Sequence, residues 1–210
     1  MVLPECSGIQ GRHQFTREEE PEEPRDLNWK ILDHKNPDED VPVWVYFFLR
    51  GNVSSIERTG AYPDQYAFVS ANYGTNVSAL RQWEAAFSPE LDFARLAAAR
   101  IEKRFSAIAE KYPDDEYGSF YEAMIRTAHD AQWEGAEIRE KYWVSRSFPD
   151  PEDPDLETAR YDFLILVTIG KTNLDRQIRT LLAGIKTETP LTRDQANAAA
   201  KAQEHFFDDF

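Results

Sequence analysis

The chain has 210 residues, of which 41% are hydrophobic and 13% aromatic, so it is long enough to bury the core of one domain and to carry an arm. Its 38 acidic residues outnumber the 24 basic ones, and the net charge of −14 argues against direct contact with nucleic-acid phosphates or with anionic lipid. The single cysteine excludes a disulfide-stapled fold and a zinc site built from several cysteines.

Residues 1–26 are predicted to form a disordered acidic arm or tether. The segment from Arg17 to Arg25 consists of charged residues and prolines, with no apolar side chain to bury. Charge repulsion and proline keep such a segment extended. We therefore place a single α+β domain in residues 27–210. No apolar run in the sequence approaches the roughly 18 residues that are needed to cross a bilayer.

Cys6 has two interpretations. The segment from Leu3 to Gly8 loosely resembles the cleavage box of bacterial lipoproteins, in which the cysteine becomes a lipid anchor and tethers the protein to a membrane. Glu5 departs from that box, and residues 1–11 as written lack the basic start and the apolar stretch of an export signal. The alternative is an ordinary free thiol in a flexible terminus.

The first half of the chain predicts two strands followed by two helices. Val41 to Leu49 is β-branched and aromatic on both faces, which is typical of a buried central strand. Gln65 to Tyr73 predicts a second strand, and Val77 to Phe87 predicts a short helix. The longest helix is expected to begin after Ser88, a good N-cap, and to end at Pro113. Its apolar residues recur at i+3 and i+4 spacing and form one stripe: Phe93, Ala97, Ile101, Phe105, Ile108 and Tyr112.

The second half of the chain predicts a helix, two strands and two further helices. In chain order these elements cover Tyr117–Ala131, Ala136–Ser147, Tyr161–Ile169, Asn173–Ile185 and Thr192–Phe207. Period-two alternation in the first of these strands places Ile138, Tyr142 and Val144 on one face. The second strand is apolar on both faces, which predicts a central position in the sheet.

Strands that are grouped in pairs and separated by helices favour the α+β class. We predict a mainly antiparallel four-stranded sheet, with the long amphipathic helix and the further helices packed on one face.

The sequence carries no recognisable catalytic or cofactor motif. It has no Gly-rich phosphate loop, no nucleophile elbow and no His-Glu-x-x-His. The four histidines are scattered, and the neighbours His129 and Asp130 point apart on a helix, so they form no oriented dyad. We predict no catalytic residues, no cofactor and no dedicated metal centre, and we expect that the protein is not an enzyme.

Two surface features are candidate binding sites. A loop after the third predicted strand carries four carboxylates, at Asp150, Glu152, Asp153 and Asp155. Calcium prefers oxygen ligands of this kind, but the loop lacks the glycine and the terminal glutamate of an EF-hand, so a solvated acidic loop is the alternative. Tyr142 and Trp143 are expected on the solvent-facing or edge side of their strand, where an aromatic pair would form a protein interface.

The stretch from Gln65 to Lys171 resembles a known family. Its Ala-rich helix carries the run Ala94 to Ile101, and two later strands contain Tyr142-Trp143-Val144 and the run Tyr161 to Val167. This order resembles a bacterial envelope lipoprotein family that includes periplasmic flagellar ring and collar proteins. The resemblance implies a small α+β domain with a long helix on the sheet, and a structural or assembly role without catalysis. It transfers no functional residue, and the large N-terminal strand region, the helix from Tyr117 to Ala131 and the C-terminal helix depart from its pattern.

The leading hypothesis is a non-enzymatic structural or protein-binding component of a bacterial cell envelope, periplasmic or anchored as a lipoprotein of a periplasmic assembly. Its partner would be another protein or a second copy of the chain, and not nucleic acid. One alternative is a cytosolic acidic protein of the inhibitor or immunity type that neutralises a basic partner. A second alternative is a cation-dependent protein that uses the acidic loops.

Overall fold

The computed structural model describes residues 29–111, 118–150, 153, 156–185, 192, 193, 196, 197, 200, 204, 206 and 207, with side-chain burial omitted for 109–111 and 118–121. The predicted arm and Cys6 lie outside the described residues. Among the described residues, no helix is long and apolar enough to span a membrane.

The centre of the fold is a four-stranded antiparallel sheet, which confirms the predicted α+β class. Its strands are β1 (Lys30–His34), β2 (Gln65–Gly74), β3 (Glu137–Pro149) and β4 (Glu157–Gly170), in the spatial order β1-β3-β4-β2. β4 is a central strand, as predicted, and Leu164, Ile165 and Leu166 are fully buried because helices cover both faces of the sheet.

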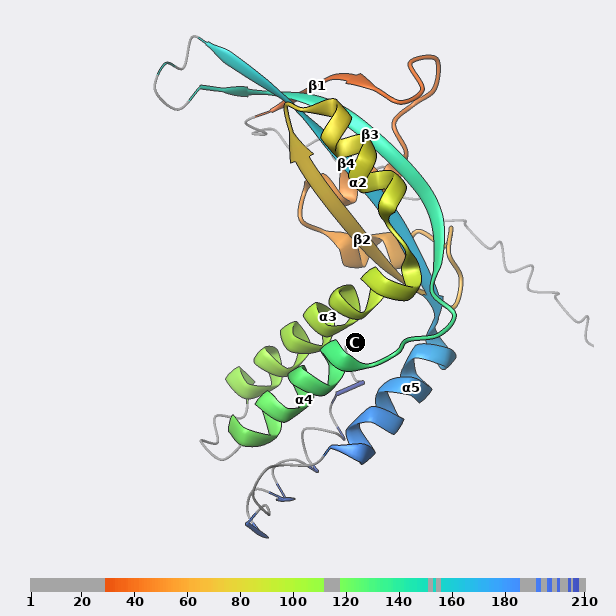
Figure 1. Cartoon of the computed structure of the whole chain (residues 1–210), viewed down its shortest axis with the longest axis vertical. Helices are drawn as coiled ribbons and strands as arrows, with labels where there is room; N and C mark the ends of the chain where they lie inside the picture. Colours follow the sequence, from red (N-terminus) through yellow and green to blue (C-terminus); the bar gives the residue numbers. More distant parts are fainter. Residues whose placement is uncertain are drawn as a thin grey trace, which may run out of the picture.

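The helices lie on the two faces of this sheet. They are α1 (Val43–Leu49), the 3-10 helix η1 (Val53–Arg58), α2 (Val77–Ala86), α3 (Pro89–Lys111), α4 (Gly118–Asp130) and α5 (Lys171–Gly184). In Figure 1, α2 lies in front of the sheet, while α3, α4 and α5 gather at its lower end. These helices bury one sheet face, and α1 and η1 bury the opposite face.

The predicted central strand over Val41 to Leu49 is wrong, because Val43–Leu49 forms helix α1 and the fourth strand is β1. The run is apolar on all sides, and over seven residues this pattern does not separate a buried strand from a buried helix. Pro42 precedes the first turn, where its missing N–H costs nothing, and its carbonyl accepts from the Val45 N–H at 2.9 Å. Trp44 then packs inward, and its indole donates to Glu140 at 2.6 Å.

The main core lies between the sheet and α3, α4 and α5. The predicted stripe of α3 is confirmed over its described residues, since Phe93, Ala97, Ile101, Phe105 and Ile108 are all buried in this core, whereas Tyr112 lies outside them. Phe206, from the segment predicted as the last helix, is buried in the same core. Of that segment, Arg193, Ala196, Asn197, Ala200 and Glu204 are described as helical.

Strand β3 contains a bulge that the sequence did not indicate. The pairing register with β4 shifts between Ile138 and Glu140, so one extra residue enters β3. Ile138 consequently packs with the main core, whereas Tyr142 and Val144 pack with α1 on the other face. The prediction that these three residues share one face is therefore wrong for Ile138.

Candidate functional site

The predicted aromatic interface at Tyr142 and Trp143 does not form one surface. Tyr142 is only 1% exposed, and its hydroxyl lies 2.9 Å from Nδ1 of His34. Burial raises the pKa of the Tyr142 hydroxyl. The prediction that Tyr142 faces solvent is wrong, because α1 covers this part of β3. Trp143 is half-buried on the opposite face, where it stacks on Phe163 with centroids 6.4 Å apart.

The predicted cation loop is described in part. The Asp150 carboxylate accepts from the Asp153 N–H at 3.4 Å, and the Asp150 N–H donates to the Leu156 carbonyl at 2.8 Å. Glu152 and Asp155 lie outside the described residues. Within the described ranges, no group of three or more His, Cys, Asp or Glu side chains is placed to hold a metal ion.

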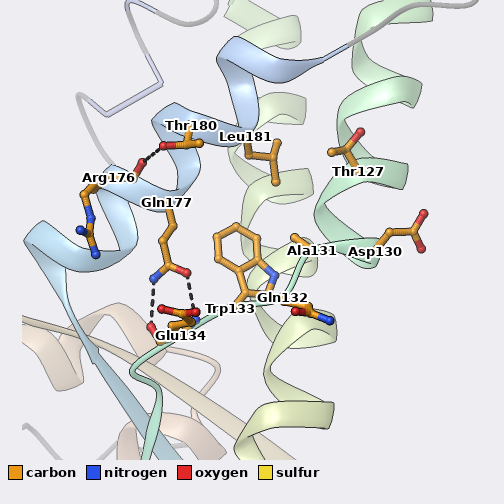
Figure 2. Close-up of a pocket in the computed structure, with 10 residues that line it drawn as sticks. All are labelled: Thr127, Asp130, Ala131, Gln132, Trp133, Glu134, Arg176, Gln177, Thr180 and Leu181. Atoms are coloured by element: carbon orange, nitrogen blue, oxygen red, sulfur yellow. Dashed lines mark hydrogen bonds between the residues drawn. The ribbon is translucent and has the colours of Figure 1, made fainter.

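A groove of about 560 Å³ lies between the C-terminal end of α4 and helix α5. Figure 2 shows the indole of Trp133 at its centre, with Leu181 beside it and polar side chains around it. Trp133 is buried, and its indole N–H donates to the Ala128 carbonyl at 3.2 Å, at the end of α4. The ring also packs edge-on against Phe93 of α3. The Trp133 side chain therefore forms the floor of the groove and also belongs to the main core.

The polar residues of the groove hold the chain between α4 and β3 in place. The Gln177 amide accepts from the Glu134 N–H and donates to the Glu134 carbonyl, both at 2.9 Å, as the dashed lines in Figure 2 show. Asn173 donates to the same carbonyl at 2.8 Å. Thr180 donates to the Arg176 carbonyl within its own helix. These hydrogen bonds attach the segment that precedes β3 to α5. We call this region of contact the joint.

Gly135 in this joint gives a direct test of the docking. Its φ is +83°, and a Cβ there would lie 2.6 Å from Nδ2 of Asn173. Gly135→Ala is expected to lower the free energy of unfolding by about 1–3 kcal/mol, through backbone strain and loss of the Asn173 contact. Chemical denaturation followed by circular dichroism measures this change. Gly60→Ala is the matched control: Gly60 also has a positive φ, +73°, but no described atom beyond its chain neighbours lies within 4 Å of its Cβ position, so only backbone strain of about 1 kcal/mol is expected. Equal effects of the two substitutions would contradict the proposed docking.

One outer edge of the sheet, along β1, is poorly suited to pairing with another chain. β1 is five residues long and carries a register shift, and short, irregular, charged strands resist pairing with other chains. Where β1 ends, Lys35 continues the protection of β3. Its N–H donates to the Trp143 carbonyl at 3.2 Å, and its ammonium group donates to the Lys141 carbonyl at 2.6 Å.

The other outer edge, along β2, is blocked only at its ends. The Ala67 N–H points outward and donates to the Glu57 carboxylate at 2.9 Å, and this carboxylate is held by Arg100 of α3 at 2.6 Å. At the far end, the Tyr73 N–H donates to the Asn72 side chain at 2.9 Å.

The middle of this edge is open. Residues two apart in a strand direct their backbone groups the same way, so those of Val69 and Ala71 also point outward. β2 is the last strand of the described sheet, and the described residues supply no partner for these groups. We call Val69 to Tyr73 the open edge; at its end, the Tyr73 N–H is capped only by the side chain of the adjacent Asn72.

A row of aromatic rings and guanidinium groups crosses the sheet beside the end of the open edge. In order, its members are Trp29, Arg146, Phe148, Arg160 and Tyr73. The guanidinium carbons lie 4.3–4.9 Å from the ring centroids, a spacing at which each cation is attracted to the ring face. Tyr73, which is 65% exposed, is the last member of the row. The row thus holds an exposed aromatic ring in place at the edge of the sheet.

One carboxylate serves both arginines of this row. Asp162 lies 2.6 Å from Nε of Arg146 and 3.6 Å from Nε of Arg160. Arg146 and Arg160 are direct partners in the register of β3 and β4, a placement that is unfavourable for two like charges. The Asp162 side chain is therefore the counter-charge that allows this end of the sheet to form.

The chain matches no protein-family model, and no curated protein and no solved structure matches it. What it does is therefore inferred from its own residues. The open edge could not be predicted from the sequence, because no local pattern tells which strand will be outermost. The alternation of Val69, Ala71 and Tyr73 was a signal only that they share a face.

Proposed function

We propose that the protein is a non-enzymatic structural or protein-binding component of a bacterial cell envelope, and that the open edge of β2 is its contact surface. The observation that carries this proposal is the outward backbone of Val69 and Ala71, which lies beside the exposed ring of Tyr73. An exposed strand edge binds an extended segment through main-chain hydrogen bonds, and neighbouring side chains add specificity.

The contrast between the two edges supports a binding role. Unprotected edges promote aggregation, so proteins blunt them with charge, bulges or covering segments. This chain uses such devices along β1, and it uses Glu57 at the start of β2. The five residues of the open edge, Val-Ser-Ala-Asn-Tyr, carry no charge in a protein with a net charge of −14. An uncharged, unprotected strand edge in such an acidic protein is consistent with a binding site that a partner covers.

The envelope part of the proposal is supported by the resemblance of Gln65 to Lys171 to the envelope lipoprotein family and by the surroundings of Cys6. Members of that family serve as assembly parts, which agrees with a contact surface made of backbone and an aromatic ring. Lipidation at Cys6 would place the domain at a membrane surface, joined to it by the predicted acidic tether.

Site-specific photo-crosslinking in the cells that make the protein tests both parts at once. A photoreactive residue at Ala71 probes the open edge, and the same residue at Leu91, which is 81% exposed on α3, is the matched control. We expect adducts from position 71 well above those from position 91, and we expect them in the envelope fraction after cell fractionation.

Equal adduct yields from the two positions would overturn the assignment of the open edge. Adducts from position 71 that appear only in the cytosolic fraction would overturn the envelope part. That result would favour the cytosolic acidic partner-binding alternative.

A further inference from the structure

We infer that the open edge pairs with the same edge of a second copy of this chain, antiparallel, with Ala71 of one protomer opposite Ala71 of its partner. The inference rests on the proposed role of the open edge as a contact surface and names its occupant. The result would be a continuous eight-stranded sheet with a two-fold axis at its centre, a closed arrangement in which both protomers use the same surface.

The register follows from which outward groups are open. Antiparallel pairing of two β2 edges must join outward positions of one copy to outward positions of the other. With Ala71 at the two-fold axis, Val69 faces Tyr73 of the partner, and the three outward positions of the open edge are all used. A shift toward the start of β2 would place Ala67 opposite Tyr73 of the partner, and the Ala67 N–H is already bound by Glu57. A shift the other way would leave the backbone of Val69 facing residue 75 of the partner, beyond the end of β2 at Gly74.

The side chains on the α1 face are complementary in this register. Val69, Ala71 and Tyr73 share that face, where the small Ala71 meets its own copy at the centre. Tyr73 lies opposite Val69 of the partner, and aromatic and β-branched residues form favourable cross-strand pairs. Because Tyr73 is 65% exposed in the single chain, this contact would remove substantial apolar area from water.

The opposite face gives a second, independent observation. Ser70 is buried, and its hydroxyl has no hydrogen-bond partner among the described residues. Pairing with Ala71 at the axis places Asn72 of the partner subunit directly across from Ser70. In the single chain, the Asn72 side chain accepts from the Tyr73 N–H, a group that the partner strand would take over. In the dimer, the Asn72 side chain of the partner subunit no longer accepts from the Tyr73 N–H. It then lies opposite the buried hydroxyl of Ser70, which it can bond.

A single-cysteine cross-link tests the register. In the Cys6→Ser background, Ala71→Cys places one thiol at the proposed axis. The Cα atoms of a hydrogen-bonded antiparallel pair lie about 5.5 Å apart, within the roughly 4.4–6.8 Å that a disulfide spans. We expect rapid disulfide-linked dimer on mild oxidation. Ala183→Cys in the same background, exposed on α5, is the control and is expected to form no disulfide-linked dimer.

A charge exchange at the same position tests the pairing without oxidation. Ala71→Lys and Ala71→Glu are each expected to abolish the dimer, because two like charges would meet at the axis, and an equimolar mixture is expected to restore it as a heterodimer. Light scattering after size exclusion measures each state. The unmodified chain is expected to dimerise more as salt rises, because salt screens the repulsion between two protomers of net charge −14.

A wild-type chain that stays monomeric at high protein concentration and moderate salt overturns the inference, as does a cross-link at position 71 no faster than at position 183. Failure of the mixed charge variants to associate overturns the register. If position 71 forms adducts with other proteins in cells while the purified chain stays monomeric, the second copy is wrong and the proposed function stands.

Discussion

Replacing Asp162 by asparagine is expected to lower the free energy of unfolding by about 3–5 kcal/mol, the cost of removing one partner from a buried ion pair. The side chains of Arg146 and Asp162 are 7% and 6% exposed, and their charged atoms lie 2.6 Å apart. Asparagine keeps the size of the side chain and removes only its charge. Two arginines that face each other across β3 and β4 would then lack a counter-charge among the described residues. Urea denaturation followed by circular dichroism measures the change.

A double substitution separates the charge from the packing. Arg146→Met combined with Asp162→Leu removes both charges and keeps apolar bulk, so it is expected to cost much less than Asp162→Asn alone. A loss below about 1 kcal/mol for the single variant would show that Arg146 and Arg160 do not depend on this carboxylate. Tyr73 should also become more mobile in the single variant, because the row of rings and guanidinium groups holds it.

The elements that the sequence predicted correctly are those with a strong local pattern. α3 begins at Pro89 as expected, because Ser88 precedes it and the Asp92 carboxylate accepts from the Ser88 N–H at 2.9 Å. β4 was predicted to be central from apolar residues on both faces, and it is. In these elements capping and periodicity agree with the tertiary packing, so local information is sufficient.

The wrong predictions depend on contacts between distant segments. Val43–Leu49 folds as a helix, and the outer position beside β3 is taken by β1, whose partners Val144 to Ser147 lie far away in the sequence. The bulge after Ile138 depends on the pairing with β4. The candidate site also depends on distant contacts. Glu57 and Arg100, which are 43 residues apart in the sequence, together protect one end of β2, and no short stretch of sequence shows that the rest of this edge is open.

Phe206→Ala is expected to lower the free energy of unfolding by about 3–5 kcal/mol, because truncating a buried phenylalanine leaves a cavity in the core. Phe206 is 0% exposed, and its ring centroid lies 5.0 Å from that of Phe105 on α3. Its carbonyl accepts from Nε of Arg104 at 2.8 Å, so backbone and ring are both fixed against α3. Thermal and chemical denaturation of the full chain measure the loss.

The neighbouring Phe207 supplies the control for this substitution. Phe207 is half-buried, and its ring lies 4.0 Å from the guanidinium carbon of Arg179 on α5. Phe207→Ala removes this cation–π contact and part of the apolar burial, so it is expected to cost only about 1 kcal/mol. If the two losses were equal, Phe206 would not be a core residue. A large difference instead makes Phe206 part of the core that supports α3. Arg100 of α3 holds the Glu57 carboxylate on the Ala67 N–H, so α3 in turn defines one end of the open edge.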